Sequence, residues 1–196
     1  MTLSLRSILI ALLALALTAC GTVKNTIADG ADTNLMLRGN DPVAYFTQKQ
    51  PVKGDPAIKA DYNGVTYRFA SQANKDAFLA SPSRYEPQYA GFCASGAPYA
   101  LKANIGADTF AIVNDRLYLY GSDRSRRNWM MDWQTNIVVG DRYWETETRD
   151  VPYRLQNAKR YTFKVDGYKT DAELDAIFAQ RKAAGTLTPL AQPYAN

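Results

Sequence analysis

The sequence predicts an α+β fold with a single core. Small antiparallel β-hairpins are each followed by a helix in a ββα-type unit, and a strand–helix extension stands at the carboxyl end. Two observations lead to this class. Residues 62–80 and 109–138 each alternate apolar and polar side chains across a turn dipeptide and then change to helical spacing. The 196 residues, 46% of them hydrophobic, suffice for one domain with its own core.

The amino-terminal residues have the pattern of an export signal. Arg6 precedes an apolar run over residues 8–17, which at about ten residues is too short to cross a bilayer of about 30 Å as a helix. The run leads into "LTACG" at residues 17–21, which resembles the lipobox of bacterial lipoproteins. The resemblance implies that residues 1–19 are a lipoprotein signal peptide and that Cys20 carries the lipid.

The lipid would decide where the protein is found. Several acyl chains on one residue hold a protein stably on a membrane. Gly21 is not the Asp that favours retention in the inner membrane of enteric bacteria. We therefore expect a lipid-anchored protein of the bacterial cell envelope, on the outer membrane and facing the periplasm. The alternative is an ordinary signal peptide cut after Ala19, with Cys20 unmodified.

A tether and a short turn are expected after the anchor. Residues 20–34 hold the lipidated Cys and then polar residues without periodicity, which predicts a flexible tether. Asp41 and Pro42 are an N-cap and N1 pair for a short helical turn. A catalytic carboxylate is the competing interpretation of Asp41.

The first predicted hairpin turns at Asn63-Gly64, a strong short-range signal for a two-residue turn. Ser71 follows as the N-cap of a helix over residues 72–80, whose apolar residues recur at helical spacing. Pro82 ends this helix, because proline cannot continue it.

The second predicted hairpin turns at Asn114-Asp115, and Ser122 caps a helix from about 123 to 138. The first turn of this helix holds the densest basic run of the chain, residues 123–128. Two interpretations stay open, the solvated face of a helix or a contact for phosphate or anionic lipid. Nothing here resembles a nucleic-acid motif, so no nucleic-acid partner is expected.

The last part of the chain predicts a strand and a helix. Residues 160–169 alternate as in a late strand or hairpin. Thr170 and Glu173 then form a capping box, and Gly185 ends the helix. We expect residues 149–196 to be an extension of the domain that precedes them.

Four stretches in order carry a family resemblance. They are "DPVAYF", "YNGVTYRFAS", "DAFLASPSRYEPQYAGFC" and "FAIVNDRLYLYGSDRSRRNW". Together they resemble the YHS-domain family, and in particular its exported bacterial lipoprotein branch. The resemblance implies a YHS-like domain over residues 35–148.

Metal-associated members of that family carry Cys in the opening turn, after the hairpin and in the helix. The resemblance implies that these members, which accompany copper-transporting ATPases and monooxygenases, bind transition metals. This sequence has Ala44, Ala70 and Asn74 at the three places, and neither Ala nor Asn is a good ligand for soft ions. We therefore expect a packing scaffold here, held by four aromatic residues: Tyr62, Tyr67, Phe69 and Phe78.

The mature chain would keep one free thiol, Cys93, in a Gly-rich turn. As a thiolate it would be a ligand for a soft transition metal such as Cu(I), or a redox-active group. The alternative is a small buried hydrophobe. Met36, Met130 and Met131 are either thioether ligands to the same metal or core residues.

Aromatic residues gather around this turn and suggest a pocket. A concave aromatic site is the default hypothesis for ligand binding. The candidate walls are Tyr85, Tyr89, Phe92 and Tyr99. The alternative is ordinary packing of a sheet against loops.

The sequence contains no His, which excludes Ser–His and Cys–His couples and removes the commonest metal ligand. We therefore expect a protein that is not an enzyme. The first hypothesis is an envelope accessory or binding protein, linked through Cys93 to metal or thiol homeostasis. Two alternatives stay open: a structural envelope lipoprotein that acts through a protein partner, and an enzyme of unknown reaction.

Overall fold

The computed structural model describes residues 22–188. The expected signal peptide and Cys20 lie outside these residues. In chain order the strands and first helices are β1 (Ile27–Asp29), β2 (Asp32–Leu35), η1 (Met36–Gly39), α2 (Ala44–Thr47), β3 (Asp55–Tyr62), β4 (Val65–Phe69), α3 (Gln72–Ala80) and α4 (Pro82–Tyr85). They continue with η2 (Gln88–Gly91), η3 (Ala94–Tyr99), β5 (Gly106–Val113), β6 (Arg116–Tyr120), α5 (Asp123–Met130), α6 (Trp133–Tyr143), η4 (Trp144–Thr148), α7 (Tyr153–Thr162) and α8 (Asp171–Ala183).

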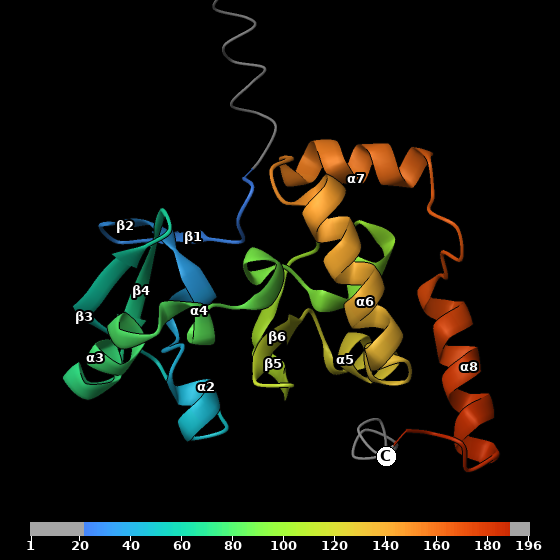
Figure 1. Ribbon diagram of the computed structural model, residues 1–196, viewed down its shortest axis with the longest axis horizontal. Coiled ribbons are helices and arrows are strands. Elements are labelled where there is room, and N and C mark those ends of the chain that lie inside the picture. Colours follow the sequence, from blue (N-terminus) through green and yellow to red (C-terminus); the bar gives the residue numbers. More distant parts are fainter. Residues whose placement is uncertain (1–21, 189–196) are drawn as a thin grey trace, which may run out of the picture.

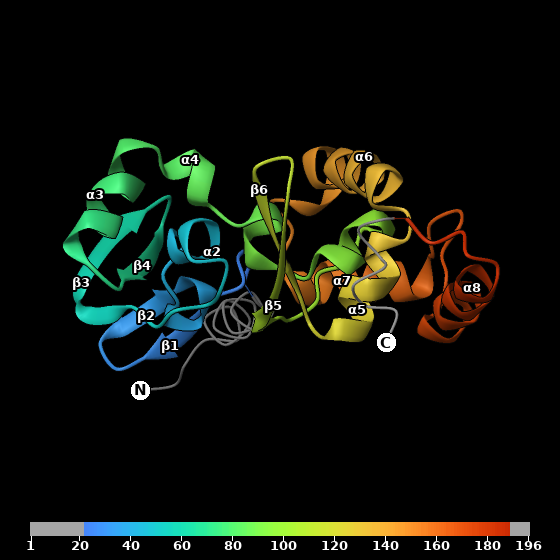
Figure 2. The same cartoon turned by 90° about the horizontal axis from the view of Figure 1, so that it is seen from below.

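The strands form two small sheets. One has four strands in the order β1-β2-β4-β3, and the other is the β5–β6 hairpin. Figures 1 and 2 show β5–β6 between the four-stranded sheet with α2, α3 and α4 on one side and α5 to α8 on the other. The predicted α+β class with small hairpins is confirmed.

Both hairpins turn where the sequence predicts. Asn63 and Gly64 have φ values of 50° and 72°, and Asn114 and Asp115 have 51° and 57°. Two successive residues at positive φ give the turn whose twist matches the flanking strands, and Asn, Asp and Gly tolerate that conformation best. The strands accordingly pair as antiparallel ladders across each turn.

The predicted N-caps are also confirmed. Ser71 Oγ accepts a hydrogen bond from the amide of Asn74 at 3.1 Å, and Ser122 Oγ does the same for Ser125 at 3.2 Å. At α8, Thr170 forms the full capping box with Glu173. Each cap satisfies donors that the first helical turn leaves open.

The single helix expected over 123–138 is two helices, α5 and α6. Asp132, with φ −134° and ψ 40°, interrupts it. The break leaves the carbonyl of Trp129 exposed to a side chain, and Asn136 Nδ2 donates to it at 2.8 Å. The side chain of Asn136, in the first turn of α6, thus stabilises a bend that apolar periodicity does not reveal.

The prediction of a tether over residues 20–34 is wrong where β1 and β2 lie. These two strands form an antiparallel pair, and β2 adds to β4 in parallel. Arg68 on β4 fixes them, since its Nε donates to Asp32 Oδ2 at 2.8 Å and its Nη1 to Asp29 Oδ2 at 2.6 Å. The partner residues stand more than thirty positions away, so local composition suggests a loop.

The strand predicted over residues 160–169 is wrong as well. Residues up to Thr162 belong to α7, and a turn with Gly167 at φ 74° leads to α8. The alternating Tyr161 and Phe163 face outward and are 65% and 69% exposed. The extension is therefore helix–turn–helix, because its apparent period of two has no neighbouring strand to pair with.

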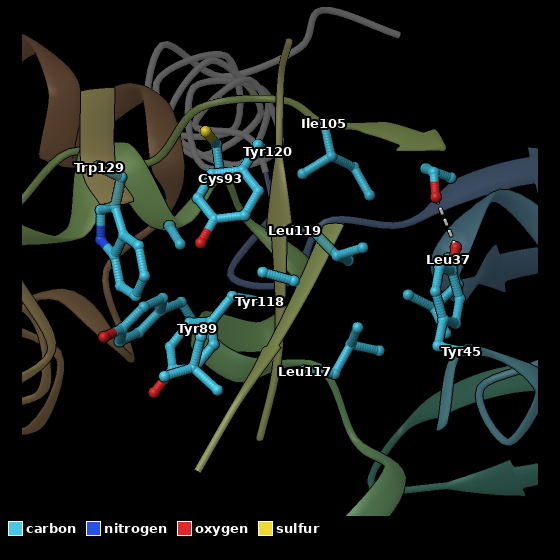
Figure 3. Close-up of a cluster of buried hydrophobic side chains, with 14 of the residues drawn as sticks. Leu37, Tyr45, Tyr89, Cys93, Ile105, Leu117, Tyr118, Leu119, Tyr120 and Trp129 are labelled. Carbon is cyan, nitrogen blue, oxygen red and sulfur yellow. Dashed lines mark hydrogen bonds between the residues drawn. The ribbon is translucent and has the colours of Figure 1, made fainter. Parts of the chain in front are cut away.

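One core joins the two sides of the molecule. On β6, Leu117 and Leu119 point toward Leu37 and Tyr45, while Tyr118 and Tyr120 pack against Trp129 (Figure 3). A strand buried on both faces reads as a nearly continuous apolar run, as "LYLY" does. The β5–β6 hairpin is thus the central layer of the fold.

Helix α8 docks on α5 through the basic run. Arg124 and Asn128 donate to the carboxylate of Asp175 at 2.8 and 3.0 Å, and Arg127 pairs with the same group. Arg127 also lies 4.4 Å from the ring centroid of Phe178. Most of the run 123–128 therefore makes intramolecular contacts, which the two interpretations from the sequence did not include.

These contacts predict an acid-sensitive docking of α8. The hydrogen bond from Arg124, and next the one from Asn128, lower the pKa of Asp175 from its ordinary 3.8 to about 2. A lowered carboxyl pKa contributes stability that is complete above pH 3.8 and is lost as the pH falls through about 2. We expect amide protection in α8 to fall over this window, measured by NMR hydrogen exchange. In Asp175→Asn the protection should be low at every pH, and equal protection in the two proteins would contradict the prediction.

Candidate functional site

One buried carboxylate, that of Asp41, lies among Ala44, Ala70 and Asn74, the three positions at which the resemblance implies Cys in metal-associated members. Asp41 is fully buried. Its Oδ2 accepts hydrogen bonds from the amide of Ala70 and from Asn74 Nδ2, both at 2.7 Å. Its Oδ1 accepts from the amides of Val43 at 2.8 Å and Ala44 at 3.3 Å.

Asp41 therefore joins the opening turn, the end of β4 and the start of α3. Asp41 caps the turn before α2 through its two bonds to that turn, although α2 itself begins at Ala44 with Val43 as its N-cap. The two longer-range bonds carry no signal in the local sequence. Four donors from three elements leave the carboxylate well satisfied. The aromatic scaffold expected beside it is present, with the Phe78 ring 4.7 Å from Tyr67, 5.3 Å from Phe69 and 5.8 Å from Tyr62.

A cavity of about 730 Å³ lies between η3, the α5–α6 bend and the segment that leads into α8. We call it the Cys93 cavity. Its lining is mixed polar and apolar and includes hydroxyl, amide and aromatic groups: Ser95, Tyr99, Asn104, Ser122, Ser125, Asn128, Trp129, Asn136 and Tyr168. A site of this size with convergent polar groups suits a small polar molecule.

Cys93 lies on the wall of this cavity and is 2% exposed. Its amide donates to the carbonyl of Ala103 at 2.9 Å, which fixes the backbone beside β6. The sulfur lies 3.0 Å from Ser95 Oγ and accepts a hydrogen bond from the amide of Gly121 at 3.3 Å. These two groups orient the thiol.

Trp129 adds a second unusual group to the lining. It is 2% exposed, and its indole N–H has no acceptor among the described residues. A buried donor without a partner is uncommon in native proteins. Within residues 22–188, no three His, Cys, Asp or Glu side chains are close enough together to hold a metal ion. The two groups that contact the Cys93 sulfur, the hydroxyl of Ser95 and the amide of Gly121, are hydrogen-bonding groups.

A second cavity, of about 600 Å³, lies on the other side of η2. Its charged wall is already paired, since Arg116 Nη1 and Nη2 donate to the two oxygens of Asp141 at 2.7 and 3.0 Å. Tyr89 donates to Asp141 at 3.0 Å, and burial raises the pKa of this tyrosine. Since Arg116 and Asp141 already bind each other, these two side chains offer less to a ligand than the groups that line the Cys93 cavity.

The prediction of one pocket walled by four aromatic residues is wrong. Tyr99 lines the Cys93 cavity and Tyr89 the second cavity, while Tyr85 packs on Phe46 and Phe92 on Tyr153. The cause is the backbone of η2, where Tyr89 and Ala90 have φ values of 55° and 49°. Left-handed residues turn the chain so that neighbouring rings enter different parts of the molecule.

Lys102 is a functional-looking residue that the sequence did not reveal. It is 1% exposed, and its ammonium donates to the carbonyls of Val23 at 3.2 Å, Arg149 at 3.1 Å and Val151 at 2.7 Å. The ammonium also lies about 5 Å from the rings of Phe92 and Trp144. Burial lowers its pKa to about 8, so it is charged at neutral pH.

Lys102 therefore holds the first described residues against the segment before α7. A lysine buried with backbone acceptors carries no local sequence signal, because its three partners come from distant parts of the chain. It is saturated by these contacts, which makes it a structural clamp.

Comparison with known proteins identifies a family for one segment of the chain. No curated protein and no solved structure matches the chain. The family model of the YHS domain matches residues 43–89, which contain the first long hairpin, α3 and the positions Ala44, Ala70 and Asn74 that meet at Asp41. Residues 43–89 of this chain are a YHS domain.

Proposed function

We propose that the protein is a lipid-anchored envelope protein, attached through Cys20, that binds a small polar ligand in the Cys93 cavity without transforming it. The observation that carries the proposal is the convergence of a thiol, hydroxyls and amides on one cavity of about 730 Å³. The lipobox at residues 17–21 supports the anchor, and the absence of His supports a binding role over a catalytic one.

The link to metal or thiol homeostasis rests on Cys93. Its sulfur is a soft donor held by Ser95 and the amide of Gly121. Cu(I) accepts ligand sets with one or two sulfurs, so a single thiol inside a polar cavity supports a weak or shared site for this ion. A thiol-bearing molecule is the other ligand class that the same sulfur would recognise.

The test uses the full-length protein in detergent, compared with Cys93→Ser. We expect Cu(I), titrated in competition with a chelator, to bind the wild type and to bind Cys93→Ser at least tenfold more weakly. Methyl methanethiosulfonate, a small thiol reagent, should modify Cys93 and lower the affinity in the same way. Ser83→Ala, a hydroxyl at the second cavity, is the matched control and should behave as the wild type.

Two results would contradict the proposal. Equal Cu(I) affinity in Cys93→Ser, together with a thiol that does not react, would show that Cys93 is only a core residue. The anchor has its own measurement: acyl labelling and membrane fractionation should be lost in Cys20→Ala, and unchanged fractionation would remove the lipid from the proposal.

A further inference from the structure

Helix α7 has its polar residues turned inward. Gln156 is fully buried and donates to the carbonyl of Ala100 at 2.8 Å. Asn157 exchanges two hydrogen bonds with the backbone of Lys102, at 2.9 and 2.7 Å. Arg160 Nε donates to Glu147 at 2.6 Å. The face that contacts the protein is therefore hydrophilic.

Three large apolar or aromatic side chains of the same segment are exposed, among the exposed polar residues Arg154, Lys159, Thr162 and Lys164. Leu155 is 51% exposed, Tyr161 65% and Phe163 69%. A surface helix of a globular protein normally has the opposite arrangement. Exposed apolar residues that cluster on one element mark a contact with another apolar phase or partner.

The position of α7 in the fold indicates that the contact is with a membrane. The amide of Tyr153, the first residue of α7, donates to the carbonyl of Thr22 at 3.0 Å. The Lys102 ammonium binds the carbonyls of Val23, which follows Thr22, and of Val151, two residues before Tyr153. Figure 1 shows this start of the described chain, in blue, beside α7. The amino-terminal segment therefore meets the folded protein at α7.

The number of residues between Cys20 and Thr22 limits how far the proposed lipid can lie from α7. Cys20 stands two residues before Thr22, and two residues span at most about 7 Å in any conformation. The acylated residue and the amino end of α7 are thus within the thickness of a headgroup layer of each other.

The charge of the segment matches an anionic surface. Residues 153–164 hold four basic residues and no acidic one. Arg160 and Lys159 both pair with Glu147, and Lys164 lies at the exposed side of the segment. Long basic side chains beside aromatic rings are typical of helices that lie in a membrane interface.

We propose that residues 153–164 lie on the phospholipid bilayer, with Leu155 and Phe163 inserted among the headgroups beside the lipid anchor. The inference rests on the anchoring part of the proposed function. The clamp at Lys102 then fixes how the whole domain stands on the membrane, with the Cys93 cavity at a constant orientation to it.

The test places a fluorescent probe at single positions of the full-length protein in vesicles that contain phosphatidylglycerol and brominated lipids. Leu155→Cys and Phe163→Cys, each in a Cys93→Ser background, carry an environment-sensitive label. Interfacial helices bury their apolar face by about 5–10 Å, so we expect a blue shift and strong quenching at both positions. Leu79→Cys on α3, where the leucine is 49% exposed, is the matched control and should show neither.

The outcomes separate this inference from the proposed function. Membrane-bound, acylated protein with labels at 155 and 163 quenched no more than at 79 would overturn the inference and leave the anchor intact. Labels that are shielded but not quenched by lipid would indicate a protein partner and would also overturn it. If the protein proves not to be acylated, the proposed anchor fails, and quenching at 155 and 163 on added vesicles still decides the inference.

Discussion

Replacing Asp41 by Ala is expected to lower the free energy of unfolding by roughly 3–5 kcal/mol. The carboxylate is fully buried and accepts four hydrogen bonds, from Val43, Ala44, Ala70 and Asn74. Its removal leaves four donors without partners inside the protein, and each unsatisfied donor is costly where water does not enter. Chemical denaturation followed by tryptophan fluorescence gives the difference.

Two further variants define the Asp41 experiment. Asp76→Ala removes an exposed carboxylate of α3 with a single side-chain partner, Gln72, and should change stability by less than about 0.5 kcal/mol. Asp41→Asn keeps the shape and one acceptor, so it should fold even if Asp41→Ala does not, and should still be destabilised. A loss below about 1 kcal/mol in both Asp41 variants would show that the carboxylate does not organise the YHS domain.

Replacing Lys102 by Met is expected to have the second-largest effect, a loss of roughly 2–4 kcal/mol. Methionine keeps the unbranched stem between Phe92 and Trp144 but leaves the carbonyls of Val23, Arg149 and Val151 without a donor. Because these carbonyls belong to segments at the edge of the fold, part of the loss should appear as local opening.

Trypsin reports that opening directly. Lys24 and Arg149 lie beside the clamp, and cleavage after them should become faster in Lys102→Met. Lys164→Met, which removes an exposed lysine, is the control and should leave both cleavage rates unchanged. Unaltered cleavage and stability in Lys102→Met would mean that the amino-terminal segment is held by other contacts, such as the bond from Asn25 to Ala90.

The contrast between the two carboxyl-terminal helices shows what local sequence can predict. The capping box of α8 depends on residues three positions apart, and the structure contains it as predicted. The last turn of α7 and the residues that follow it predict a strand over 160–169, because the alternation of Tyr161, Phe163 and Val165 resembles a strand when its neighbours are unknown. The polar face of α7 satisfies groups around Lys102 and Glu147, which no helical periodicity of apolar residues would reveal.

Some residues of the candidate site can likewise be predicted from the sequence, and others cannot. Cys93 was singled out from the sequence and does line a cavity. The predicted aromatic walls were wrong, since the left-handed residues of η2 direct those rings to separate places. Asp41 was recognised as a cap but not as the meeting point of Ala70 and Asn74, and Lys102 was not recognised at all.

Local patterns along the chain predict the two hairpins, their turns, the helix caps and the YHS resemblance, because each depends on residues close together in the chain or on a pattern shared with relatives. The strands β1 and β2, the burial of Lys102 and Asp41, and the buried polar face of α7 follow only from contacts in the folded protein. These features depend on partners that stand tens of residues away, as Arg68 does from Asp32. Burial and pairing at that range follow from the packing of the whole chain, and local patterns do not encode them.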